Sequence, residues 1–343
     1  MPSAPPPLPA ATGRGLFIVR NAQSGTAVIR SDPAALFAER LPDAVVRELG
    51  EGDDLDAIVE EAMEAVPTPP PGAAGASPGA SGRVGPTAPA VLGVYGGDGS
   101  VSRMAQLARR YGRPLLVLPG GTFNHFAGSA GLTDVETAID AFQAGTTIEV
   151  SAVEVTTADG AAILALNAVS VGAYPELIDE REQHRPKLGK WLGGIVAAWH
   201  ALGEAAPLVI VRDGRRARVW SVFVGVGTND PGRVATMQRA HLEEPVLDVR
   251  IHHARGTRLR AIASLAFGRR TAAVLRTLRL MPPRSDLERL VVSDFELTVR
   301  PGPGHPSVFV HDGELEEEPG DEFTLRCAAV PRAVTVFVPP REV

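Results

Sequence analysis

The chain contains very little cysteine, lysine or aromatic side chain. Its 343 residues include one cysteine, Cys327, two lysines, Lys187 and Lys190, and 5% aromatic residues. A single cysteine excludes an intrachain disulfide framework and a cysteine-rich zinc site. The formal net charge of −6 is not that of an electrostatic nucleic-acid binder, which would carry a basic footprint. Nucleic acid is therefore not an expected partner.

Targeting signals and long apolar runs are also missing. The first residues, rich in proline and alanine, have neither a basic start nor an apolar stretch, so they do not resemble a secretory signal peptide. The most apolar stretch, residues 193–211, is interrupted by His200 and Glu204 and fails the test of roughly 20 apolar residues for a membrane span. We expect a cytoplasmic protein that works in solution or peripherally on the inner face of the membrane.

The length and the pattern of strands and helices predict two domains. Residues 1–13 are expected to be disordered. Residues 14–145 alternate short apolar strands with helices, which predicts an α/β domain with a mostly parallel sheet. Within them, residues 67–89 are nearly all Pro, Gly, Ala, Ser and Thr; we interpret them as a mobile insertion, with a domain boundary as the alternative. Residues 146–343 contain mainly consecutive strand-like runs, which favours an antiparallel sandwich or barrel.

A glycine-rich loop, Gly96-Gly97-Asp98-Gly99-Ser100, lies between a predicted strand and a helix predicted over 101–111. Its glycines allow the backbone to approach a ligand, and the N-terminus of the next helix suits phosphate. Asp98 in such a loop indicates a cation such as Mg²⁺ between carboxylate and phosphate. A plain tight turn is the alternative.

Two further polar loops follow predicted strands. One is Asn21-Ala22-Gln23-Ser24-Gly25-Thr26, and the other runs from Pro119 to Phe126 and contains Thr122 and Asn124. The carboxyl ends of parallel strands share one edge of a sheet, so the three loops together predict a nucleotide site. Neither the Walker A motif nor the dinucleotide fingerprint is present, which leaves a less common kind of phosphate-binding kinase loop.

In the order of these motifs the chain resembles the diacylglycerol kinase catalytic-domain family, which includes sphingosine kinases and bacterial lipid kinases. The family's signatures are NPxSG, GGDGT, P-x-GT-x-N-D-(F/L)-A and, far downstream, V-DGE. They stand here as Asn21-Ala22-Gln23-Ser24-Gly25, Gly96-Gly97-Asp98-Gly99-Ser100, Pro119-Gly120-Gly121-Thr122-Phe123-Asn124-His125-Phe126-Ala127 and Val310-His311-Asp312-Gly313-Glu314.

The resemblance implies an ATP-binding α/β domain like that of phosphofructokinases and NAD kinases, then a C-terminal β-sandwich, with the active site in the cleft between them. It implies ATP and Mg²⁺ as cofactors and a lipid alcohol, diacylglycerol first of all, as acceptor. Phosphoryl transfer needs positioning, charge neutralisation and a group that accepts the hydroxyl proton.

The resemblance also assigns roles to residues. Asp98 would act on the metal through bound water, and Asp312 would be the general base or lie beside it, with Glu314 as the close alternative. The alternative for Asp312 is a purely structural role in an ordinary Asp-Gly turn before a solvated acidic loop. The residues that would bind ATP are Asn21, Ser24, Gly25, Gly96, Gly97, Asp98, Gly99, Ser100, Thr122 and Asn124.

The chain departs from the family pattern at several positions. Ala22 and Ser100 are mild changes, whereas His125 stands where many members have Asp; it would donate to phosphate or cap a helix. Residues 240–248 resemble the family's A-x-L-D-D-G-x-L-D segment, but both acids are Glu and the glycine is Pro245. A metal at Glu244 is therefore only weakly predicted.

The surface that reaches the lipid is predicted from basic residues. Residues 255–289 contain nine arginines, from Arg255 to Arg289, and two acids, interleaved with apolar side chains. This pattern fits docking on an anionic membrane; a helix packed on the second domain with its arginines in water is the alternative. Lys187 and Lys190 would attract acidic headgroups or simply begin a solvated helix.

Two other functions stay open. One is a kinase of a non-lipid alcohol such as NAD, and the other is a non-catalytic protein that binds nucleotide or lipid. Dimers occur among related bacterial enzymes, so a homodimer is possible, but nothing in the sequence fixes the oligomeric state.

Overall fold

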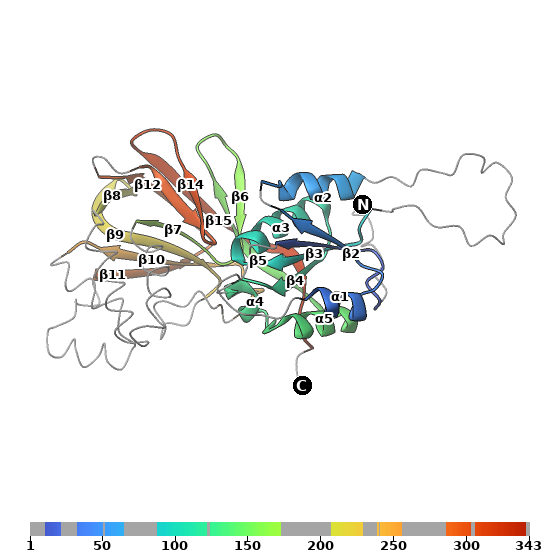
Figure 1. The fold of residues 1–343 in the computed structure, drawn as a ribbon. Coiled ribbons are helices and arrows are strands. Elements are labelled where there is room, and N and C mark those ends of the chain that lie inside the picture. Colours follow the sequence, from blue (N-terminus) through green and yellow to red (C-terminus); the bar gives the residue numbers. More distant parts are fainter. Residues whose placement is uncertain are drawn as a thin grey trace, which may run out of the picture. The chain divides into compact units, whose positions relative to one another are not determined.

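The computed structural model describes residues 11–21, 33–50, 52–64, 88–121, 124–172, 207–228, 239, 241–255, 286–302 and 306–340 (Figure 1). The chain divides into two compact units. Unit 1 comprises Met1–Ile148 and Val334–Val343, and unit 2 comprises Glu149–Ala333. Most of the expected disordered tail and of the Pro/Gly-rich insertion lies outside the described residues.

Unit 1 is built on a parallel sheet. The order of its strands is β2 (Val45–Leu49), β1 (Leu16–Asn21), β3 (Val91–Gly96) and β4 (Leu115–Pro119), and every neighbouring pair is parallel. β3 and β4 are buried at every position, as expected for central strands covered on both faces. β2 is the exposed edge.

Helices cover both faces of this sheet. α2 (Leu55–Glu64) and α3 (Asp98–Tyr111) lie on one face, and α1 (Ala34–Arg40) and α5 (Val135–Ala144) lie on the other (Figure 1). The short α4 (His125–Ser129) follows the second glycine loop. α3 begins three residues earlier than the sequence predicted, so the second half of the first glycine loop is its first turn.

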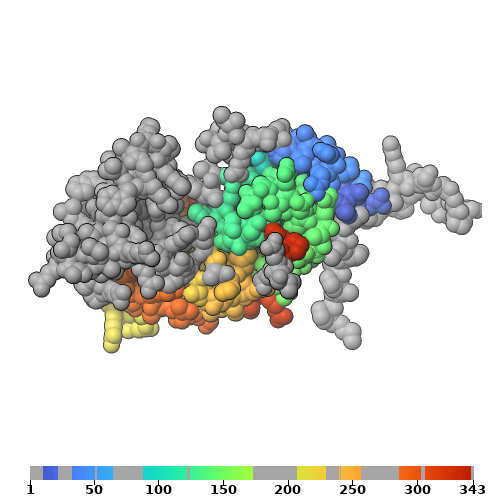
Figure 2. Space-filling view, turned by 90° about the horizontal axis from the view of Figure 1, so that it is seen from below, coloured from blue at the N-terminus to red at the C-terminus, as the bar shows by residue number. Residues whose placement is uncertain are grey.

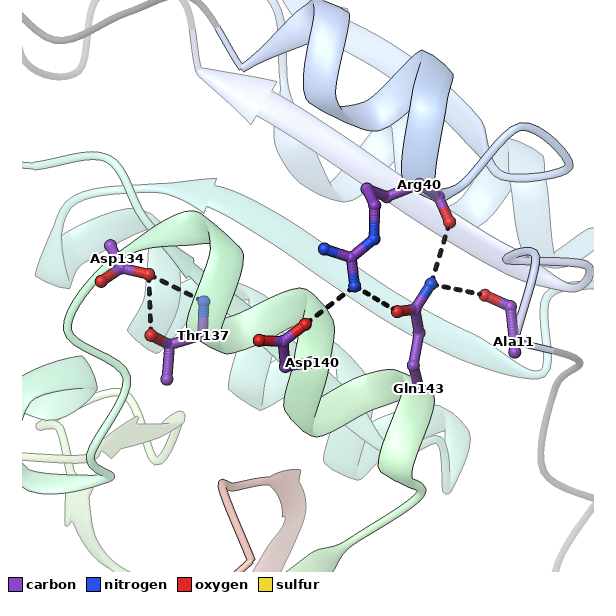
Figure 3. Close-up of polar contacts among 6 residues, drawn as sticks. All are labelled: Ala11, Arg40, Asp134, Thr137, Asp140 and Gln143. Atoms are coloured by element: carbon purple, nitrogen blue, oxygen red, sulfur yellow. Dashed lines mark hydrogen bonds and ion pairs between the residues drawn. The ribbon is translucent and has the colours of Figure 1, made fainter.

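Polar contacts join α1 and α5, which cover the same face of the sheet (Figure 3). Arg40 of α1 donates to the carboxylate of Asp140 at 2.8 Å and to the side-chain oxygen of Gln143 at 2.5 Å. The Gln143 amide donates in turn to the carbonyls of Arg40 and Ala11, at 3.0 and 3.1 Å. α5 therefore holds both α1 and the residues before β1.

The N-terminus of α5 is capped by its own sequence. Asp134 is the N-cap residue, and its carboxylate accepts from the backbone N–H and the hydroxyl of Thr137, both at 2.7 Å (Figure 3). These bonds, the backbone bond first, lower the pKa of Asp134 below its ordinary value of 3.8.

The C-terminal segment returns to unit 1. β15 (Phe323–Phe337) ends with Val336 paired in parallel to Leu115 of β4, and Phe337 packs edge-on against Phe142 at 5.2 Å between ring centroids. Figure 2 shows these last residues, in red, beside the green surface of unit 1. The sequence predicted that residues 146–343 form the second domain, whereas the division into compact units places Val334–Val343 in unit 1.

Unit 2 consists of β-strands in its described part, and the neighbouring strands recorded there pair antiparallel. β9 is central and pairs with β7, β8 and β10. The strands are β5 (Thr147–Thr156, most of it in this unit), β6 (Ala162–Ala165), β7 (Ala168–Gly172), β8 (Leu208–Arg212), β9 (Arg215–Val226), β10 (Leu247–His253), β11 (Leu287–Val292), β12 (Asp294–Arg300), β13 (Val308–His311), β14 (Glu314–Glu317) and the first part of β15.

One apolar core of mainly Val, Ile, Leu and Phe side chains holds these strands together. It also contains Cys327, whose burial raises the pKa of the thiol to about 12 and keeps it protonated. The predicted fold class, a parallel α/β domain followed by a β-rich domain, is confirmed. Residues 191–202 and 258–280, where the sequence predicts two helices within the second half, lie outside the described residues. In the described part of the chain, no helix is both long and apolar enough to cross a membrane.

Candidate functional site

The carboxyl ends of β1, β3 and β4 lie at one edge of the parallel sheet, as the sequence predicted. Asn21 is the last residue of β1, and its side-chain amide donates to the hydroxyl of Ser100 in the first turn of α3, at 3.2 Å. Ser24 and Gly25, from the same predicted loop, lie outside the described residues. The edge thus joins the first polar loop to the first glycine loop.

The two glycine loops touch backbone to backbone. The N–H groups of Gly120 and Gly121 both donate to the carbonyl of Gly96, at 3.0 and 3.1 Å. A Cβ on Gly121 would lie 2.4 Å from the Cα of Gly97, and one on Gly120 would lie 2.9 Å from the ring of Tyr95. The second loop therefore needs its glycines because the first loop occupies the space, a reason that sequence reasoning did not supply.

Gly97 differs from these two glycines. A Cβ there would make only an ordinary contact of 3.5 Å, and the backbone φ of −86° is open to any residue. Packing within the described structure does not require glycine at this position. We therefore still interpret Gly97 as a glycine that lets a ligand approach the backbone.

Asp98 ties the first loop to the helix that follows the second. Its two carboxylate oxygens accept from the backbone N–H groups of His125, at 3.0 Å, and Phe126, at 3.1 Å. These are first-turn amides of α4, so Asp98 caps that helix from a distant part of the sequence. The predicted action of Asp98 on a metal stays a prediction. At His125 the backbone, not the side chain, makes this contact.

Asn124 shapes the second loop. Its backbone has the left-handed conformation, with φ 51° and ψ 46°, which asparagine tolerates better than most residues. Its side-chain oxygen accepts from the N–H of Gly121 at 2.9 Å, and its amide donates to the carbonyl of Gly121 at 2.8 Å. The predicted contact with nucleotide stays a prediction, and Thr122 lies outside the described residues.

The assembled edge has features that suit phosphate. Gly97 carries no side chain, and the first-turn amides of Gly99 and Ser100 lie at the positive end of the α3 dipole. For a metal the described donor at this edge is the single carboxylate of Asp98. Among the described residues, no group of three or more His, Cys, Asp or Glu side chains could hold an ion.

In unit 2 the predicted catalytic pair lies on the hairpin between β13 and β14. His311 pairs with Glu314, and the two residues between them, Asp312 and Gly313, have φ of 47° and 93°. Positive φ at both positions is typical of a type I′ turn, for which Asp-Gly is a preferred sequence. Glu314 is exposed at the start of β14.

The Asp312 side chain is buried, unlike an ordinary turn carboxylate. Its Oδ2 accepts from the N–H of Leu166 at 2.6 Å, and its Oδ1 accepts from the N–H groups of Asn167 and Ala168 at 2.8 and 2.9 Å. Three N–H donors favour the ionised form of a carboxylate. The hairpin turn thus presents its carboxylate to the bend at residues 166–168, which leads into β7.

A buried arginine that sequence reasoning missed holds the same bend. Arg239 donates to the carbonyl of Leu166 at 2.9 Å and to the carbonyl of Leu242 at 2.6 Å. Burial lowers the pKa of Arg239 to about 10, while the charges of Asp312 and Glu244 oppose that shift, so Arg239 is a cation at neutral pH. Nothing in the sequence pointed to Arg239 except its position just before residues 240–248.

Glu244, the weakly predicted metal ligand, is engaged by Thr228. Its Oε2 accepts from the backbone N–H of Thr228 at 2.9 Å, and hydrogen bonds from the side chain and then the backbone of Thr228 lower the pKa of Glu244. The carboxylate fastens the end of β9 to the loop before β10. A role in metal binding stays a prediction.

One described arginine of the predicted basic stretch forms an ion pair within unit 2. Arg289 lies on β11 and forms a two-pronged ion pair with the fully buried carboxylate of Asp248, at 2.8 and 2.9 Å, which also accepts from Arg250. Burial alone would raise the pKa of Asp248, but the hydrogen bonds from Arg289 and Arg250 lower it. Arg289, with 34% of its side chain exposed, therefore pairs with a buried carboxylate of β10. Residues 256–285 lie outside the described part.

The first part of the chain matches a model of a known protein family. Residues 16–155 match the family model described as the diacylglycerol kinase catalytic domain, a range that covers unit 1 from β1 through α5. No protein with curated annotation matches the chain.

Solved structures from Bacillus anthracis str. Sterne share the fold. One, described as a diacylglycerol kinase, has 16% sequence identity and a TM-score of 0.56 and covers 95% of this chain and 97% of its own. Another, provisionally named a diacylglycerol kinase, has 15% identity, a TM-score of 0.57 and the same coverage. At this identity the likeness shows the fold alone.

Proposed function

Because residues 16–155 belong to the diacylglycerol kinase catalytic-domain family, we propose that the chain is a lipid kinase. It would transfer the γ-phosphoryl group of ATP to a lipid hydroxyl, with diacylglycerol to phosphatidic acid as the first candidate reaction. One observation carries the proposal: the matched range contains the two glycine loops that lock together at the carboxyl edge of the sheet.

The nucleotide phosphates would bind at the backbone of the first glycine loop. Gly97 leaves the backbone accessible, and the first turn of α3 supplies N–H donors. Asn21 and Ser100, already hydrogen-bonded to each other, would line the same site. Asp98 and Asn124 would keep the two loops in register through their bonds to backbone groups. Mg²⁺, when bound, would neutralise phosphate charge, with Asp98 as the described carboxylate nearest in sequence to the phosphate-binding amides.

The proton of the acceptor hydroxyl would go to a carboxylate of the Asp312–Glu314 hairpin. Asp312 is buried and accepts three backbone N–H bonds, whereas Glu314 is exposed. A peripheral contact with anionic lipid, through residues near Arg255 and through Lys187 and Lys190, is part of the proposal. Pelleting with anionic vesicles that weakens as salt rises would support this contact, and absence of pelleting at any salt concentration would reject it.

The test is transfer of radiolabel from γ-labelled ATP to a panel of lipid extracts, with NAD as a separate acceptor and with EDTA in parallel. The wild-type chain is compared with Asp312→Asn and Glu314→Gln. Asp213→Asn is the matched control, because Asp213 occupies the same position of an Asp-Gly hairpin turn, between β8 and β9, but is exposed.

We expect labelled lipid with the wild type and the control, and loss of label with the variant whose carboxylate is the base. Labelled NAD without labelled lipid would support the alternative kinase. ATP binding without any labelled product would reject the kinase in favour of a nucleotide-binding protein.

A further inference from the structure

We infer that Arg239 is a positioning residue for the Asp312 carboxylate. It holds the carbonyl of Leu166 and so fixes the bend whose N–H groups converge on that carboxylate. The consequence for turnover rests on the proposed function, whereas the structural claim does not.

The geometry of the bend carries the inference. The peptide units of residues 166–168 point their three N–H groups at Asp312, while the carbonyl of Leu166 faces the Arg239 guanidinium at 2.9 Å. The carbonyl of Asn167 accepts from the N–H of Val226, and the carbonyl of Ala168 accepts from the N–H of Asp312, both at 3.0 Å. Each carbonyl of the bend therefore has a donor, and among these three described donors Arg239 is the charged one.

Charge gives Arg239 a role that a neutral donor could not fill. Asp312 is a buried carboxylate whose direct partners in the bend are backbone dipoles, and Arg239, itself 5% exposed, is a nearby buried cation that interacts electrostatically with it. A buried charge without a counter-charge is costly. The other acid that interacts with Arg239 is Glu244, which Thr228 already holds.

Arg239 also reaches the loop before β10, through the carbonyl of Leu242. That loop has its own anchor in Ser151, whose N–H donates to the carbonyl of Leu242 at 2.8 Å and whose hydroxyl donates to the carbonyl of Glu243 at 2.9 Å. A purely structural role of Arg239 in this loop can therefore be separated from its role at the bend, because Ser151→Ala loosens the loop and leaves Leu166 untouched.

The experiment compares Arg239→Met and Arg239→Lys with Ser151→Ala and with Arg216→Met, which removes an exposed arginine of β9. Amide hydrogen exchange is measured at single-residue resolution on the full chain. We expect Arg239→Met to speed exchange at residues 166–168 about tenfold or more relative to β9 and β10, with a smaller effect of Arg239→Lys. The two controls should leave these three amides unchanged.

Turnover is measured on the same proteins. We expect Arg239→Met to lower kcat about tenfold or more with the KM for ATP within about twofold, and Arg239→Lys to recover part of the loss. Unchanged exchange at residues 166–168, or exchange raised equally across unit 2, would overturn the inference. So would faster local exchange with an unchanged kcat. If Arg239→Met fails to fold, Arg239→Lys decides by the same two measurements. If the wild type phosphorylates nothing, the proposed function fails while the exchange data still decide the role of Arg239.

Discussion

Two Asp-Gly turns show how much one residue's environment matters. Asp213-Gly214 and Asp312-Gly313 each connect antiparallel strands, and both aspartates have positive φ, 51° and 47°. The Asp213 side chain is 84% exposed, whereas Asp312 is 5% exposed and accepts three backbone N–H bonds. The dipeptide specifies the turn, and the surroundings specify whether its carboxylate is buried.

This difference predicts unequal costs of the same substitution. Asp312→Asn turns an amide NH₂ toward one of the three N–H donors, and an unsatisfied buried donor pair costs roughly 1–3 kcal/mol of unfolding free energy. Asp213→Asn should change stability by no more than about 0.5 kcal/mol. Urea unfolding curves of the two variants provide the measurement, and coincident midpoints would contradict the burial of Asp312. The same curves show whether lost kinase activity in Asp312→Asn reflects chemistry or folding.

The glycine loops allow a second paired test. Gly121→Ala forces a backbone shift against Gly97 and should cost roughly 1–3 kcal/mol of stability, as overpacking does. Gly97→Ala fits sterically and should cost no more than about 0.5 kcal/mol. If the Gly97 backbone contacts phosphate, the added methyl should still weaken ATP binding about tenfold or more. Thermal unfolding and calorimetric ATP titration separate the two effects; full ATP affinity in Gly97→Ala would move the phosphate site elsewhere.

At the scale of single elements, helix ends in unit 1 are fixed by carboxylates from two sources. Asp134 caps α5 from the adjacent residue, in the pattern that sequence predicts well. Asp98 caps α4 from 27 residues earlier in the chain. Only the first kind of cap is readable from a local window.

The local cap gives a prediction with a pH dependence. Asp134→Ala should lower the unfolding free energy by about 1 kcal/mol at neutral pH. Because the folded state lowers the pKa of Asp134, this stabilisation is present above its unfolded value of 3.8 and is lost as the pH falls through the lower folded value. Asp134→Ser keeps an acceptor without the charge, so it should retain most of the stability at pH 7 without that acid loss. If the difference in unfolding free energy between Asp134→Ala and the wild type stayed constant as the pH fell below 3.8, the assignment of Asp134 as a charged helix cap would be contradicted.

At the scale of the whole molecule, unit 1 is not one continuous segment. The family match covers residues 16–155, yet the sheet and core of this unit also include the end of β15. Val336 and Phe337 are fully buried there, against β4 and α5. The fold of unit 1 therefore depends on the last strand of the chain.

Truncating the Phe337 side chain tests this dependence. Phe337→Ala removes a buried ring that packs on Phe142 and should cost about 3–5 kcal/mol. Arg326→Ala, on the exposed side of the same strand, removes a surface ion pair with Glu296 and should cost at most about 1 kcal/mol. Unfolding followed by circular dichroism gives both values, and equal losses would show that the β15 end does not support unit 1.

The sequence by itself determined the features that depend on short-range patterns. Alternating apolar strands and helices predicted the parallel α/β unit, consecutive strands predicted the β-rich unit, and the order of glycine motifs predicted the family. Only the tertiary structure decided which distant segments meet. Asp98 caps α4, Arg239 and Asp312 both hydrogen-bond to the bend at residues 166–168, and β15 pairs with β4. The physical reason is that propensity and periodicity act within a few residues of the chain, whereas buried hydrogen bonds and ion pairs depend on which segments packing brings together.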